Sequence, residues 1–185
     1  KVANEATVVE NTAAGTYVYP SEYEITNLRY GGGKNGTLCV VGITDRLRYR
    51  AEIMIVKDGK LFINIRDDTE LRYTFPGGGV NLHEDPRDTA LREAQEEVRM
   101  NVANVKYGGT YVKIFSEEKV KKSWKKHNVE KADQYTGSYS VVFIGTYFSN
   151  YDGDIAKEDQ SNMIKTGKFI DIAEVYDLLD PIHQE

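Results

Sequence analysis

Residues 77–100 read GGGVNLHEDPRDTALREAQEEVRM: three glycines, a short polar stretch, and then helical spacing with many acidic residues. Asp85 suits a helix N-cap, and Pro86 suits the first helical position. Asp88 places negative charge in the first turn, where the helix dipole favours it. We therefore expect a helix that begins near Pro86 directly after a glycine-rich turn.

The residues of this helix divide between two faces. At about 100° per residue, one apolar flank should pack on a sheet, and it consists of Ala90, Leu91, Ala94 and Val98. Glu93, Glu96 and Glu97 fall elsewhere, at spacings of three and four residues, where like charges repel. They also lie toward the helix C-terminus, where the dipole disfavours anions. Local rules therefore predict an energetic penalty for this acidic cluster.

A divalent cation would remove the penalty. Magnesium takes carboxylate oxygens, keeps several waters and commonly bridges to substrate phosphates. The alternative is a solvated acidic face, which is the common fate of surface glutamates. That alternative does not account for the glycines at 77–79, which allow close approach of the backbone to a ligand, or for Arg92 beside the cluster. We interpret the helix as a metal-binding platform.

The sequence around the helix predicts strands. Apolar, β-rich runs occupy 37–43, 51–56, 60–65, 71–75, 102–107, 110–115, 139–148 and 168–172. Lys57-Asp58-Gly59 separates two of these runs and predicts a tight hairpin. A short amphipathic stretch at 173–179 predicts a final helix. Strands on both sides of a central helix indicate an α/β fold with a mixed sheet.

Composition restricts the class of protein. The chain has 185 residues, one cysteine and a formal net charge of −5. This length supports one sizeable core, and the acidic balance gives no general reason to bind nucleic acid or an anionic membrane. No run is long enough to span a membrane, and the start of the chain does not resemble a signal peptide. We expect a soluble cytoplasmic protein without a membrane partner.

One segment is expected to precede the main domain at 36–185, and another is expected to be inserted in it. Residues 1–35 form an N-terminal extension of unknown role, and its glycines do not make a phosphate loop because Lys34 is followed by Asn35. Residues at about 116–137 form a lysine-rich insertion. The insertion is either a solvated amphipathic helix anchored by Trp124 or a phosphate-binding surface that includes Lys121 and Lys125.

The glycine-to-helix stretch resembles the Nudix box, G-x5-E-x7-R-E-U-x-E-E-x-G-U, in which U is apolar. The matching residues are Gly78, Glu84, Arg92, Glu93, Ala94, Glu96, Glu97 and Met100. Arg99 stands where the family usually has glycine, which puts the geometry of the helix exit in question. The resemblance extends over about residues 37–180 and omits the two segments described above.

The resemblance implies an α/β/α sandwich that hydrolyses a diphosphate linked to another moiety, with Mg²⁺ or Mn²⁺ as cofactor. Carried over by position, Glu93, Glu96 and Glu97 are metal ligands, and the carbonyl of Gly77 is a further one. Glu84 and Arg92 become partners that orient the glutamates. The implied substrate is a small nucleoside diphosphate derivative, such as a nucleotide, a nucleotide sugar or a dinucleotide.

The chemistry needs a group that accepts a proton from water, and Glu97 or Glu93 is the expected base. The base can also come from a later loop in this family, where Asp152, Asp154 and Glu158 are candidates. Each of these three is more simply explained as part of an acidic surface loop.

Arg66 and Arg72, which approach the box from upstream, are candidates for contact with substrate phosphates. The substrate itself stays open, with the 5′ end of a capped RNA as one alternative. A homodimer is one alternative for the assembly. The competing function is a non-catalytic Nudix-type module that binds a nucleotide or a partner protein, and Arg99 is the feature in its favour.

Overall fold

A computed structural model of the chain describes residues 7–12, 15–19, 28–30, 38–41, 46–66, 72–116, 135–154 and 167–179. The chain forms two compact units. Unit 1 contains residues 1–50, 79–84 and 110–140, and unit 2 contains residues 51–78, 85–109 and 141–185. Three long strands contribute residues to both units: β5 (Arg46–Lys57), β9 (Met100–Phe115) and β10 (Gly137–Asn150).

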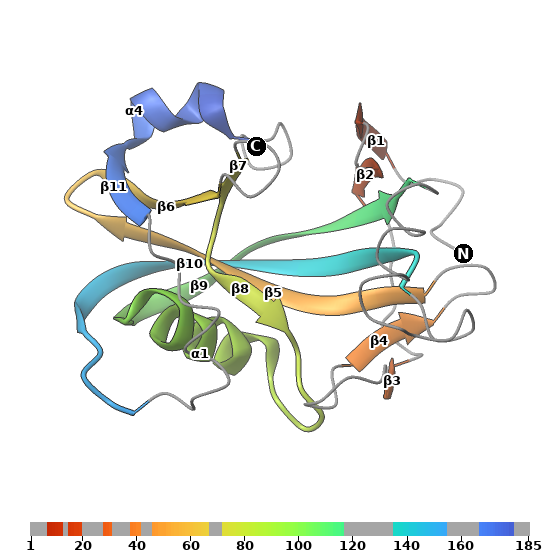
Figure 1. The fold of residues 1–185 in the computed structure, drawn as a ribbon, viewed down its shortest axis with the longest axis horizontal. Coiled ribbons are helices and arrows are strands. Elements are labelled where there is room, and N and C mark those ends of the chain that lie inside the picture. The colour runs from red at the N-terminus through yellow and green to blue at the C-terminus, as the bar shows by residue number, and fades with distance from the viewer. Residues whose placement is uncertain are drawn as a thin grey trace. The chain divides into compact units, whose positions relative to one another are not determined.

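Unit 1 contains the first four strands of the chain (Figure 1). They are β1 (Thr7–Thr12), β2 (Gly15–Tyr19), β3 (Leu28–Tyr30) and β4 (Leu38–Val41). β2 pairs antiparallel with β1 and with the last residues of β9, whereas β3 pairs with β4 and β4 with the start of β5. The segment 1–35 therefore contributes strands to the sheet.

The predicted hairpin is present in unit 2. β5 and β6 (Lys60–Arg66) pair antiparallel, with Val56 opposite Leu61 and Lys57 opposite Lys60. Asp58 and Gly59 form the two-residue turn with φ values of 50° and 74°. Both values lie in the left-handed region that such a turn requires, which is why Asp-Gly was a sound predictor.

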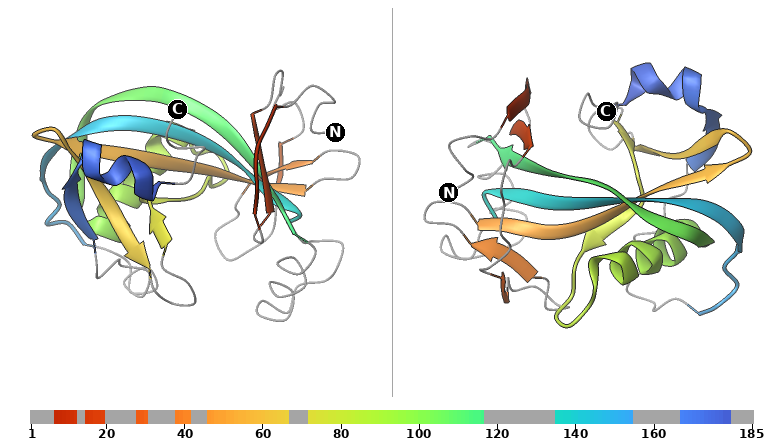
Figure 2. Two further views of the ribbon diagram at one scale, coloured as in Figure 1. Left: turned by 90° about the horizontal axis from the view of Figure 1, so that it is seen from above. Right: turned by 180° about the vertical axis from the view of Figure 1, so that it is seen from behind.

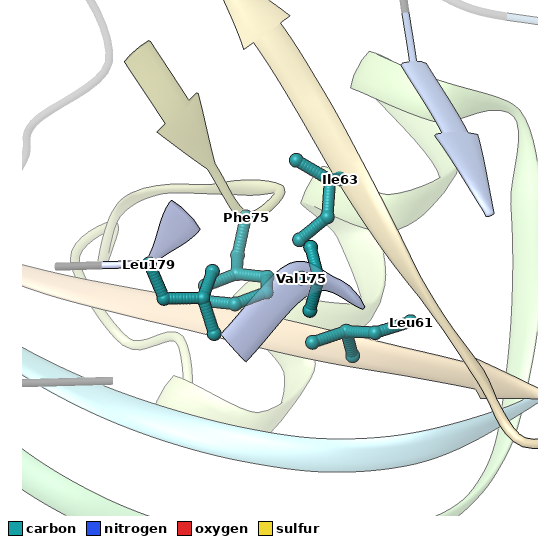
Figure 3. Close-up of a cluster of buried hydrophobic side chains, with 5 residues drawn as sticks. All are labelled: Leu61, Ile63, Phe75, Val175 and Leu179. Atoms are coloured by element: carbon teal, nitrogen blue, oxygen red, sulfur yellow. The ribbon is translucent and has the colours of Figure 1, made fainter. Parts of the chain in front are cut away.

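β6 lies at the centre of a small group of strands in unit 2. Its partners are β5, β7 (Arg72–Thr74) and β11 (Gly167–Asp171). Helix α4 (Ile172–Val175) and the 3₁₀ turn η2 (Tyr176–Leu178) follow β11, at the predicted place for a final helix. Figure 3 shows the apolar cluster that joins these elements, made of Leu61, Ile63, Phe75, Val175 and Leu179. The cluster fixes β6 and the residues that lead from β7 to the glycines.

Helix α1 spans Pro86–Val98, so the predicted start is confirmed. Oδ1 of Asp85 accepts a hydrogen bond from the backbone N–H of Arg87 at 2.8 Å, which is the expected N-cap contact. The predicted packing face was partly wrong, because Leu91 and Val98 are only half-buried. The buried residues are Thr89, Ala90, Ala94 and Glu97. The buried stripe is therefore rotated toward one of the box glutamates.

The strands after α1 are longer than predicted. Residues 102–107 and 110–115 belong to one strand, β9, since Gly108 and Gly109 do not interrupt it. Gly109 has a φ of 156°, a value that an L side chain rarely adopts, so this pair changes the local geometry without ending the strand. β9 and β10 are neighbours in the sheet, and they are the long green and cyan strands of Figure 2. No helix among the described residues is long and apolar enough to cross a membrane.

Candidate functional site

The first glycines of the box hold one of the glutamates. The backbone N–H of Gly77 donates a hydrogen bond to Oε2 of Glu97 at 3.0 Å, and the side chain of Glu97 is 8% exposed. A Cβ added at Gly77 would lie 2.6 Å from the carbonyl oxygen of Ala51. Only glycine fits this position, so the close contact between β8 (Gly77–Gly79) and the carboxylate depends on it.

The second glycine makes room for another glutamate. A Cβ at Gly78 would lie 2.0 Å from Oε1 and 2.4 Å from Cδ of Glu93. The carboxylate of Glu93 therefore rests against the backbone at Gly78. The Gly-Gly step brings together two carboxylates that stand four residues apart on α1.

Arg92 lies between two box glutamates. Its Nη1 donates to Oε1 of Glu93 at 2.9 Å and to Oε2 of Glu96 at 2.8 Å. The side chain of Arg92 is 28% exposed, and those of Glu93 and Glu96 are 13% and 24% exposed. These charge-assisted hydrogen bonds reduce the repulsion that the spacing of the glutamates predicts. The role of Arg92 in orienting metal ligands stays a prediction.

The donor set of this site fits a hard divalent cation. Carboxylate and backbone carbonyl oxygens are the ligands that Mg²⁺ prefers, and Glu93, Glu96, Glu97 and Gly77 offer these atoms. Among the described residues, no three Asp, Glu, His or Cys side chains converge as a metal cluster. Glu93 and Glu96 turn toward Arg92 instead, and Glu97 turns toward Gly77. The metal role of the three glutamates stays a prediction.

Arg99, the departure from the box, keeps the helix exit that a glycine would give. It is the C-cap of α1 with φ 57° and ψ 43°, and its N–H is directed to the carbonyl oxygens of Ala94 and Gln95. This is the left-handed conformation usual after a helix, at a cost of roughly 1–2 kcal/mol for a residue with a Cβ. The substitution therefore leaves the path of the backbone unchanged.

The side chain of Arg99 holds the loop that follows β10. Nη1 donates to the carbonyl oxygen of Gly153 at 2.8 Å, and the guanidinium lies 5.4 Å from the centre of the Tyr151 ring. The backbone N–H of Tyr151 donates to the carbonyl oxygen of Arg99 at 2.8 Å. Asp152 and Asp154, two of the late-loop candidates, are exposed on the loop tied in this way.

Glu84 belongs to unit 1, where it closes a tight turn. Its Oε2 accepts a hydrogen bond from the backbone N–H of Asn81 at 3.1 Å, and its own N–H donates to the carbonyl oxygen of Asn81. The turn includes His83 with a φ of 65°. Glu84 therefore shapes the connection between the glycines and α1, and its role toward the glutamates stays a prediction.

The other predicted residues are less fully described. Arg66 and Arg72 are register partners across β6 and β7, so their backbone positions are adjacent. Lys121, Lys125 and Glu158 lie outside the described residues. Nothing in the described part of the chain tests their roles.

Sequence reasoning missed Glu52. This glutamate lies in β5 and is 5% exposed, and its Cγ would be 2.8 Å from a Cβ at Gly77. The stem of a third glutamate, which is buried, therefore lies against the same glycine step as Glu93 and Glu97. The signal was available, because Glu52 is a charged residue inside the apolar run AEIMIV, and buried charges are rare.

Comparison with protein families matches residues 40–185 to the NUDIX domain. A MutT protein from Bacillus halodurans is a structural neighbour, with a TM-score of 0.50, 17% identity, and coverage of 71% of this chain and 73% of that one. A NUDIX hydrolase from Nitrosomonas europaea has a TM-score of 0.48 and 18% identity over 71% of this chain and 77% of that one. A pyrophosphohydrolase from Bacillus subtilis has a TM-score of 0.47 and 16% identity over 84% and 72%. No curated protein gives a significant match.

Proposed function

Because the chain belongs to the Nudix family of hydrolases and has its α/β fold, we propose that it hydrolyses a diphosphate linkage in a nucleoside diphosphate derivative. Members of this family act on small nucleotide derivatives and generally use divalent metals. The observation that carries the proposal is the packing of Glu93 and Glu97 against Gly77 and Gly78. This packing supports a site in which carboxylates face a substrate diphosphate beside a glycine backbone.

The proposed cofactor is Mg²⁺ or Mn²⁺. Glu93, Glu96 and Glu97, together with the carbonyl of Gly77, would hold it. When bound, such a cation neutralises phosphate charge and lowers the pKa of a bound water. Arg92 keeps two of the carboxylates in place through its shared Nη1.

The protein residues supply the remaining chemistry. In hydrolysis, the oxygen of a water bonds to phosphorus, and the bridging P–O bond breaks with its electron pair passing to the leaving phosphate. Glu97 or Glu93 accepts the proton of the water, and the N–H of Gly77 fixes Oε2 of Glu97. Asp154 and Glu158 are the alternative bases. No covalent intermediate is required, since positioning and charge neutralisation suffice for phosphoryl transfer.

Four cationic residues are proposed to meet the substrate phosphates. They are Arg66, Arg72, Lys121 and Lys125. The adjacent positions of Arg66 and Arg72 across β6 and β7 support a shared contact with one anion. An anionic substrate needs such local cations, because the net charge of the chain is −5.

The test is turnover of a substrate panel in the presence of Mg²⁺, Mn²⁺ or EDTA. The panel contains nucleoside di- and triphosphates, nucleotide sugars, dinucleoside polyphosphates and capped RNA. We expect metal-dependent turnover of one class, and at least a 100-fold loss of kcat in Glu97→Gln. Glu174→Gln, which changes an exposed glutamate of α4, should keep the wild-type rate. An unchanged rate in Glu97→Gln would exclude it as an essential ligand or base.

The alternative, a non-catalytic binding module, drew its support from Arg99. The left-handed backbone of Arg99 weakens that support, because the helix exit is the one that glycine would give. Binding of a nucleotide without turnover of any panel member would favour the module.

A further inference from the structure

The proposed function gives no role to Arg99, which stands where the Nudix box usually has glycine. Arg99 ends α1 in a left-handed conformation that is unfavourable for a residue with a Cβ. Strained residues of this kind persist where the surrounding contacts hold them, and they are frequent at functional sites. The side chain of Arg99 makes such contacts with a loop that lies 54 residues further along the chain.

The loop that follows β10 is attached to Arg99 at two points. The backbone N–H of Tyr151 donates to the carbonyl oxygen of Arg99 at 2.8 Å. Nη1 of Arg99 donates to the carbonyl oxygen of Gly153, also at 2.8 Å, and the guanidinium lies 5.4 Å from the centre of the Tyr151 ring. Figure 1 draws this segment in blue, where the chain leaves β10 beside α1. One residue therefore holds both ends of the segment 151–153.

Tyr151 continues the attachment to the next residue. A Cβ added at Gly153 would lie 2.3 Å from Oη of Tyr151, so the backbone at Gly153 rests against the tyrosine side chain. Oη of Tyr151 donates to the carbonyl oxygen of Asp154 at 3.4 Å. The backbone of Asp154 is thus held on one side by the bond from Arg99 to Gly153 and on the other by Tyr151.

The attached loop lies at the end of α1 that carries two of the box glutamates. Arg99 follows Glu97 by two residues and Glu96 by three, which is about 3 to 4.5 Å along the axis of a helix. The Cα of Asp154 is about 3 Å from the carbonyl oxygen that Arg99 binds, because both atoms belong to one peptide unit. The guanidinium of Arg99 therefore sets the distance between Asp154 and this end of α1.

Asp154 differs from the box glutamates in what surrounds its carboxylate. Each of the three glutamates accepts a hydrogen bond from Gly77 or Arg92. Asp154 is exposed, and among the described residues its carboxylate has no hydrogen-bond partner. A carboxylate in contact with water and held in place by its backbone is suited to accept a proton from that water.

We propose that Arg99 is a positioning residue, which holds the loop 151–154 so that Asp154 accepts the proton of the attacking water. The inference rests on the proposed function and selects Asp154 among the alternative bases. The oxygen of the water bonds to phosphorus, the bridging P–O bond breaks with its electron pair passing to the leaving phosphate, and Asp154 then releases the proton to solvent. Arg99 touches neither water nor substrate in this role and acts through the loop.

The experiment is a double-mutant cycle with Arg99→Gly, Asp154→Asn and the variant that carries both changes. Arg99→Gly keeps the helix exit and removes the attachment of the loop, so kcat should fall about ten-fold with little change in KM, and Asp154→Asn should lower kcat about 100-fold. The double variant should be no slower than Asp154→Asn, because Arg99 acts only through that carboxylate. Losses that multiply in the double variant would overturn the inference.

Rescue and control variants separate positioning from a general structural role. Arg99→Lys keeps a donor for the carbonyl oxygen of Gly153 and should recover most of the lost kcat. Arg87→Ala removes an exposed arginine from the first turn of α1 and should keep the wild-type kcat. Calorimetric titration should give Arg99→Gly the wild-type affinity for Mn²⁺. Weaker Mn²⁺ binding would overturn the inference, because the damage would then lie in α1 itself.

Amide hydrogen exchange tests the attachment without any turnover. The amides of residues 151–154 should exchange faster in Arg99→Gly than in the wild type, and Arg87→Ala should leave them unchanged. Unchanged exchange in Arg99→Gly would contradict the attachment whatever the substrate. Wild-type kcat in Arg99→Gly or in Asp154→Asn would remove the positioning role and leave the hydrolase standing, since the substrate panel decides the proposed function. Absence of turnover of every panel member would overturn both.

Discussion

At the scale of single residues, Arg99 has a strained backbone and a side chain with several contacts. Its left-handed conformation costs free energy that glycine would not lose, whereas its guanidinium holds Gly153 and faces Tyr151. Arg99→Gly removes both the strain and the contacts, while Arg99→Ala removes only the contacts. We expect Arg99→Ala to be less stable than Arg99→Gly by about 1 kcal/mol in urea denaturation. Equal stability of the two variants would show that the backbone conformation is not strained.

Glu52 provides a second prediction at this scale, because it is buried beside Gly77 and keeps a charge there at neutral pH only if the surroundings balance it. If its carboxylate is one of the charged groups around the metal ion, Glu52→Gln should fold normally and bind Mn²⁺ several-fold more weakly. Calorimetric titration with Mn²⁺ measures this change in affinity, and Glu174→Gln, which alters an exposed glutamate, is the control. Unchanged Mn²⁺ affinity would restrict Glu52 to a structural role in β5.

At the scale of elements, local chemistry predicted the boundaries and tertiary packing decided the faces. The hairpin at Asp58-Gly59 and the N-cap at Asp85 follow from residues within a few positions of each other, so both were predictable. The buried face of α1 includes Thr89 and Glu97, which hydrophobic periodicity assigns to solvent. Glu97 is buried because Gly77, twenty residues away, donates to it, and periodicity does not contain that contact.

The same distinction separates the parts of the candidate site. Spacing within the box was sufficient to select the glutamates and Arg92, and the structure joins Glu93, Glu96 and Arg92 by hydrogen bonds. The strands formed by residues 7–30 needed partners from β9 and β4, far along the chain, and their sequence alone gave only an extension of unknown role.

At the scale of the whole molecule, the negative net charge makes the stability of the folded protein depend on binding of the cation. Glu93, Glu96 and Glu97 gather three of the negative charges of a chain whose net charge is −5, so a bound divalent ion should stabilise the folded protein by mass action. At a Mg²⁺ concentration 100 times its Kd, the gain is about 2.7 kcal/mol, or roughly 5–10 °C in melting temperature for a chain of this size. Differential scanning calorimetry with Mg²⁺ and then EDTA measures this shift, which should be reversible. Glu93→Gln and Glu97→Gln should lose most of the shift, whereas Glu174→Gln should retain it. The same shift in all three variants would place the ion elsewhere on the acidic surface and remove the metal role from α1.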